Sequence, residues 1–111
     1  MQWQDEQRGD GIVAFPTGRV DESTAQDFSA FLEASVDQAA ETPSKKLIVN
    51  MAGLDYMSSR GLRSLTLAKR KADGLGVAIL LAAPNDVMRE ILAISRYDKI
   101  FAISDSVEAA L

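Results

Sequence analysis

Two short apolar runs with one helical stretch between them constrain the fold of this chain most. The runs KKLIVNM (45–51) and VAILLAA (77–83) are apolar on both faces, which is typical of strands buried inside a sheet. Between them, apolar side chains recur at helical spacing from Leu62 to Ala72. Two strands joined by one helix pair in parallel through a right-handed crossover. The sequence therefore predicts an α/β fold.

The segments before this unit predict a hairpin and a helix. MQWQDEQR (1–8) and IVAFPTG (12–18) flank a GDG turn, so we expect an antiparallel hairpin at the edge of the sheet. An apolar stripe at helical spacing then follows, and it ends near TPS (42–44). Ser23 and Gln26 have the spacing of a capping box at the start of this helix.

The segments after the second run predict one more strand between two helices. Pro84 and Asn85 open a third helix, and a last strand covers residues 100–104. The residues expected to share one face of this helix are Val87, Met88, Ile91, Leu92 and Ser95. Ser104 or Asp105 is expected to cap a terminal helix. We thus expect a single domain (1–111) with a mixed, mostly parallel sheet, an N-terminal antiparallel hairpin and about four helices.

Composition narrows the class of protein. The longest apolar run, GVAILLAAP (76–84), is too short to cross a bilayer, and no signal peptide is visible. Without cysteine there is no disulfide, so we expect a cytoplasmic protein with no membrane insertion. The net charge of −4 argues against direct nucleic-acid binding, which requires a basic surface. A polar protein partner fits this balance better.

The side chains available for catalysis are few. The chain has no histidine and no cysteine, so an ordinary neutral-pH base, an imidazole metal ligand and a thiolate nucleophile are all missing. Asp21 and Asp55 both follow predicted strand ends, but Asp21 is better explained as a hydrogen-bond acceptor in the turn before the first helix. GLG (74–76) precedes a strand and is interpreted as a helix end, not a nucleotide loop. We expect a non-enzyme that needs no cofactor.

The stretch LDYMSSRGLRSL (54–65) places two hydroxyls at a helix start. Ser58 is expected to be the N-cap, accepting from the backbone N–H of residue 60 or 61. Ser59 follows the cap, where it points to solvent beside unpaired N–H groups and can receive a phosphate. Arg60 and Arg63 form a basic surface behind it, which either docks a partner or cradles the phosphate.

Three segments together resemble the STAS domain, in particular the bacterial anti-sigma factor antagonists. They are GRVDESTA (18–25), KKLIVNMAGLDYMSSRGLRSL (45–65) and ISRYDKIFAISDSVEAAL (94–111). The resemblance implies a switch of partners without turnover. An anti-sigma factor serine kinase phosphorylates the antagonist at the start of the second helix, the unmodified antagonist binds that kinase, and a PP2C-type phosphatase resets it.

In the register of this resemblance Ser59 is the phosphoacceptor, with Ser58 the second choice. Asn50 stands where an aspartate is common, Ser58 where some members have aspartate, and Arg60 where a small residue is usual. These departures leave open an altered kinase or a loss of phosphorylation. The residues expected to contact the partner are Asp21, Asn50, Asp55, Met57, Ser58, Ser59, Arg60, Gly61 and Arg63.

A second function stays open from the sequence. The chain is also compatible with a constitutive STAS subunit, such as the small component of a lipid-transport ABC assembly or of a stress-signalling scaffold. In that case the same helix docks permanently and Ser59 only packs. The oligomeric state is undetermined by the sequence.

Overall fold

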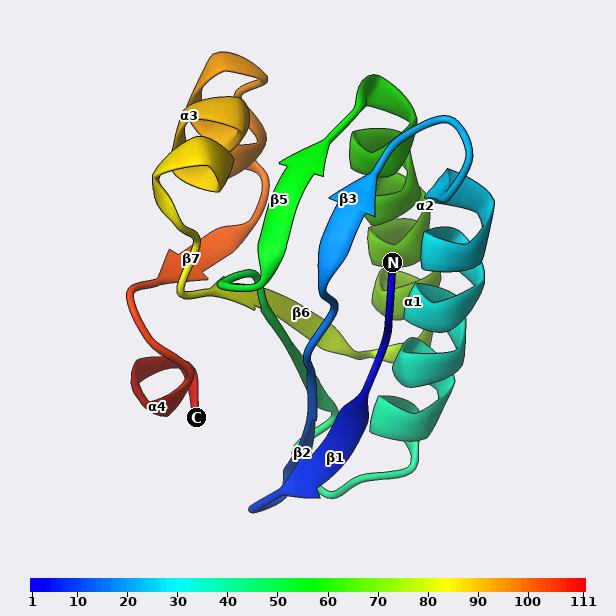
Figure 1. Cartoon of the computed structure of the whole chain (residues 1–111). Coiled ribbons are helices and arrows are strands. Elements are labelled where there is room, and N and C mark those ends of the chain that lie inside the picture. Colours follow the sequence, from blue (N-terminus) through cyan, green and yellow to red (C-terminus); the bar gives the residue numbers. More distant parts are fainter.

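A five-stranded sheet forms the centre of the computed structural model, which describes residues 1–111 (Figure 1). In spatial order its strands are β1 (Asp5–Arg8), β2 (Gly11–Ala14), β4 (Lys46–Asn50), β6 (Ala78–Ala82) and β7 (Ala102–Ser104). β1 and β2 pair antiparallel, and every other neighbouring pair in this sheet is parallel. The predicted mixed sheet with its N-terminal hairpin is therefore confirmed.

Four α-helices and one short 3-10 turn accompany the sheet. They are α1 (Ala25–Ala40), α2 (Ser59–Leu75), α3 (Asp86–Ile94), η1 (Tyr97–Lys99) and α4 (Val107–Ala110). Figure 1 shows α1 and α2 side by side on one face of the sheet, with α4 near the C-terminus on the other. The number of α-helices agrees with the prediction.

The alternation of side chains along the central strands explains these two layers. In β4, Leu47 and Val49 join the large core under α1 and α2, while Ile48 joins the small core under α4. All three are at most 1% exposed. Full burial of each such side chain contributes about 1.5–3 kcal/mol relative to exposure, so this strand anchors both layers.

A second, two-stranded sheet was not predicted. It pairs β3 (Gly18–Val20) with β5 (Leu54–Met57) in parallel. The predicted strand 12–18 is wrong beyond Ala14, because the chain leaves the main sheet around Pro16, whose nitrogen cannot donate to a ladder. β5 was not predicted as a strand; its two middle side chains are both exposed, so it lacks the alternation of buried and exposed residues.

Several helix ends differ from the prediction. The expected capping box is wrong: Thr24 is the N-cap of α1 but its side chain makes no capping bond to the helix, while Ser23 donates to Asp21. α4 is capped by Ser106, not by the two residues before it. Val87 was expected to share a face of α3 with Met88, but Val87 is 50% exposed whereas Met88 is buried. By contrast, α2 ends at a left-handed Gly76, as GLG predicted.

β6 is less buried than a central strand was expected to be. Its first residue is exposed and the next two are half-buried. β7 reaches only the last part of β6, from Leu80 to Ala82, so the start of β6 has a neighbour on one side alone. The short final strand therefore explains the difference.

The first turn of α2 packs closely on the second sheet through Gly61. A Cβ at this position would lie 2.6 Å from Cγ of Met57 and 2.7 Å from Cγ1 of Val20. Contacts this short require neighbouring atoms to move. The missing side chain thus lets α2 begin directly against β3 and β5.

We expect Gly61→Ala to lower the free energy of unfolding by about 1–3 kcal/mol, because the added methyl group overpacks this contact. Gly74→Ala is the matched control in the same helix, since a Cβ there meets nothing within 4 Å. That change should stabilise the protein by about 0.5 kcal/mol through helix propensity. Urea denaturation measures both, and equal effects of the two substitutions would contradict the packing argument.

Candidate functional site

Ser58 fixes the first turn of α2. Its side-chain oxygen accepts from the backbone N–H of Gly61 at 3.3 Å, so the predicted N-cap is confirmed. Its own backbone N–H donates to the carbonyl of Val20 at 2.8 Å, which ties the helix start to the end of β3. Ser58 is half-buried, and its hydroxyl is already engaged within the chain.

Ser59 is the first residue of α2 and is exposed, as the sequence predicted. Its hydroxyl makes no hydrogen bond within the chain, unlike that of Ser58. The first turn of a helix also leaves backbone N–H groups without intrahelical partners, which favours negative charge nearby. Of the two serines, Ser59 is the one whose hydroxyl oxygen is accessible to a partner protein.

The loop between β3 and α1 lies beside this turn and contributes carboxylates. Arg60 Nη1 lies 3.2 Å from Glu22 Oε2, and this pair links the loop to α2. Both side chains are more than half exposed, so the pair stabilises the fold weakly, by about 0–1 kcal/mol. The loop therefore places charged side chains beside the start of α2, and their exposed positions can adjust to a partner.

Asp21 closes the turn before α1, as predicted. The Ser23 hydroxyl donates to its Oδ1 at 2.8 Å and the Ser23 backbone N–H at 3.0 Å. These two bonds, followed by a bond from Thr24 and the charge of Arg19, lower the pKa of Asp21 below the ordinary aspartate value. Asp21 is half-buried and is held ionised in this turn at neutral pH.

The other two predicted contact residues with acidic or amide side chains are Asp55, which lies in β5, and Asn50, which ends β4. Asp55 is exposed near the start of β5, whereas Asp21 follows the end of β3, whose last residue pairs with Met57. The two carboxylates are therefore at different levels of the small sheet and do not form a pair. The Asn50 side chain accepts from the backbone N–H of Ala52 at 2.9 Å, which shapes the turn between β4 and β5.

Two predicted contact residues need correction. Met57 is 2% exposed and belongs to the large core, and Gly61 is buried against it. Neither can present a side chain to a partner. Both act by packing the start of α2 against the second sheet, which keeps Ser59 at the rim.

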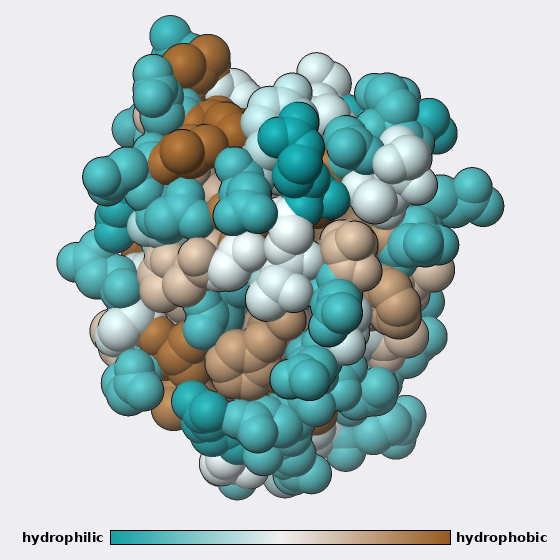
Figure 2. All heavy atoms as spheres, in the orientation of Figure 1, coloured by the Kyte–Doolittle hydropathy of each residue, from teal (hydrophilic) through white to brown (hydrophobic).

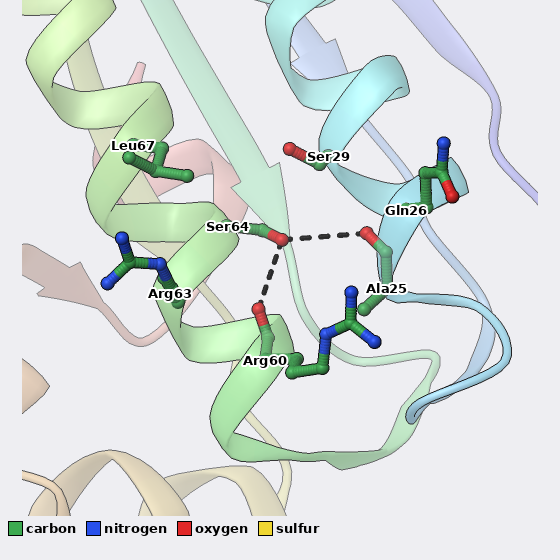
Figure 3. Close-up of a pocket in the computed structure, with 7 residues that line it drawn as sticks. All are labelled: Ala25, Gln26, Ser29, Arg60, Arg63, Ser64 and Leu67. Carbon is green, nitrogen blue, oxygen red and sulfur yellow. Dashed lines mark hydrogen bonds between the residues drawn. The ribbon is translucent and has the colours of Figure 1, made fainter.

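A hollow of about 280 Å³ lies between α1 and α2, next to the first turn of α2 (Figure 3). Its lining residues are Ala25, Gln26, Ser29, Arg60, Arg63, Ser64 and Leu67. The Ser64 hydroxyl donates to a helical carbonyl, that of Arg60, at 3.1 Å. The α1 side of this hollow was not predicted; the small side chains Ala25 and Ser29 are the only feature of the sequence that indicates it.

The surface around the site is polar. In Figure 2 the side chains above the carboxyl ends of β3 and β5 are mostly hydrophilic (teal) or intermediate (white), and strongly apolar ones (brown) gather over α3. No group of three histidine, cysteine, aspartate or glutamate side chains is arranged to hold a metal ion. No helix has the length and apolarity needed to cross a bilayer. The arrangement is suited to binding another protein through charged and polar contacts.

Sequence comparison finds one protein family, and individual relatives, that match most of this chain. The family model of the STAS domain matches residues 2–110. BtrV of Bordetella bronchiseptica, described as an anti-sigma factor antagonist, is 29% identical over 99 residues, covering 89% of this chain and 82% of BtrV. A STAS-domain containing protein of Pseudomonas aeruginosa is 33% identical over 87 residues, covering 78% of this chain and 81% of that protein.

Solved structures show the same fold at lower identity. The unphosphorylated anti-sigma factor antagonist SpoIIAA superposes with a TM-score of 0.76 at 18% identity, covering 98% of this chain and 92% of that chain. The phosphorylated form of the Bacillus cell fate determinant SpoIIAA gives a TM-score of 0.69 at 20% identity, covering 98% and 96%. At these identities the likeness concerns the fold.

We expect Ser58→Ala to lower the free energy of unfolding by about 1 kcal/mol, because the Gly61 N–H loses its cap. Ser59→Ala is the matched control and should change stability by less than about 0.5 kcal/mol, since that hydroxyl bonds nothing in the chain. Thermal or urea unfolding of the two variants distinguishes the serines. A larger loss in Ser59→Ala would contradict the assignment of the cap.

Proposed function

The chain belongs to the STAS domain family, and on this premise we propose that it is an anti-sigma factor antagonist controlled by phosphorylation of Ser59. In its unmodified form it binds an anti-sigma factor serine kinase, and that kinase phosphorylates it. A PP2C-type phosphatase removes the phosphate. The protein itself is a non-catalytic binding module.

The observation that carries this proposal is the contrast between the two hydroxyls at the start of α2. Ser58 Oγ is occupied by the Gly61 N–H, whereas Ser59 is exposed and unbonded. A kinase needs an accessible hydroxyl on a segment that it can contact. Ser59 meets this condition without any change in the fold, and Ser58 would have to give up its cap.

The relatives support the same role. BtrV is described as an anti-sigma factor antagonist, and SpoIIAA has been solved in both an unphosphorylated and a phosphorylated form. Those descriptions concern those proteins. They become relevant here because this chain matches the STAS family model along nearly its whole length and carries an exposed serine at the start of α2.

Electrostatics gives the size of the affinity loss that a phosphate on Ser59 would cause. A phosphate adds about −1.5 to −2 charges at pH 7. The arginines of the α2 start attract partner carboxylates, so a phosphate on Ser59 brings like charges together across the interface. One such contact at ~4 Å costs about 4 kcal/mol at an effective dielectric constant near 20. This corresponds to roughly a thousandfold loss of affinity.

The switch requires no refolding. The start of α2 is held by the bond from Ser58 N to Val20 O, by the Ser58 cap and by the close packing of Gly61. None of these contacts involves the hydroxyl of Ser59. A phosphate there changes the charge of a rigid surface and leaves its support intact.

We expect Ser59→Asp to weaken binding to the kinase partner by tenfold or more, while Ser59→Asn, which has nearly the same shape without the charge, stays within about threefold of wild type. Isothermal titration calorimetry with the purified kinase measures both, and circular dichroism confirms that both variants fold. Equal affinities for the Asp and Asn variants would contradict charge control at this residue.

Phosphate mapping in native cells separates this proposal from permanent docking in a larger assembly. Mass spectrometry should find phosphate on Ser59 under at least one growth condition, and a kinase should co-purify with the unmodified protein. Co-purification with a membrane ATPase and no phosphate under any condition would instead favour the constitutive subunit.

A further inference from the structure

We propose that a phosphate on Ser59 is bound by Arg63 of the same helix. This inference rests on the proposed phosphorylation and names what happens to the phosphate once it is attached. Phosphorylation then has two effects at once: it adds an anion at the rim, and it engages a cation that the unmodified surface offers to a partner.

Helix geometry selects Arg63 over its neighbour. Residues four positions apart lie above one another on a helix, with their Cβ atoms about 5–6 Å apart, whereas adjacent residues point in different directions. Ser59 and Arg63 have this spacing within α2 and both are exposed. An acidic group that precedes a basic one by four residues is also the more favourable order. Arg60, at the adjacent position, lacks this alignment.

The two arginines differ in their present contacts. Arg60 extends across the hollow toward α1 in Figure 3 and is paired with Glu22 at 3.2 Å. Arg63 extends to the opposite side of α2, away from α1, and no carboxylate lies within 4.0 Å of it. Its guanidinium group is therefore available. A guanidinium can bind a phosphate through two parallel hydrogen bonds, which makes it well suited to this role.

The test installs phosphoserine at position 59 by genetic encoding, so that no kinase is needed, and follows the phosphate by ³¹P NMR as a function of pH. A bound guanidinium favours the dianion and lowers its second pKa, which is about 6 when free. We expect Arg63→Gln to raise that pKa by about 0.3 relative to the otherwise identical phosphoprotein. The difference should shrink in 1 M salt, since the pair is exposed.

Arg60→Gln and Arg70→Gln are the matched controls, each removing one arginine from the same helix. Both should shift the pKa less than Arg63→Gln. The proposal is overturned if Arg63→Gln titrates like the parent phosphoprotein, or if either control shifts the pKa as much. Because the phosphate is installed without the kinase, this result is independent of whether a kinase partner is found, and a failure here leaves the calorimetric test of Ser59 unaffected.

Discussion

The attachment of the α2 start to the small β3–β5 sheet determines which of the two neighbouring serines is free. Ser58 uses both its backbone and its side chain there, donating to Val20 and accepting from Gly61. Gly61 has no side chain at the point where Val20 and Met57 leave no room for one. With its neighbour committed in this way, Ser59 has no structural task, and its hydroxyl stays at the surface. A free serine on a fixed support is what a reversible charge switch requires.

The same surface combines both signs of charge. Asp21 is held ionised by the Ser23 bonds, and Glu22 pairs with Arg60 across the gap between loop and helix. Arg63 adds an unpaired cation on the outer side of α2. Such a pattern favours a charged partner that complements each sign in its place. If Ser59 is phosphorylated as we propose, one added dianion at this surface would change the partner's affinity by orders of magnitude without a change in shape.

The features that could be predicted from the sequence are those that local patterns of residues determine. The central strands were visible as apolar runs, and the Ser58 cap and the helix end at Gly76 followed from well-defined local chemistry. The small sheet was missed because β3 and β5 are short and pair only in the tertiary fold. For the same reason Met57 was expected to contact the partner although it is buried: the helix start was predicted, but not the strand that leads into it from the core. The hollow between α1 and α2 also depends on tertiary packing, which no local pattern reveals.

Amide hydrogen exchange, compared between the Ser59-phosphorylated and the unmodified protein, shows whether the phosphate acts on a rigid surface. If phosphorylation acts on a rigid surface, protection of the amides in β3, β5 and the body of α2 stays the same, and changes are confined to the first turn of α2 and the loop beside it. Loss of protection spreading through the small sheet or along α2 would show that the phosphate works by loosening the fold, and would contradict the account.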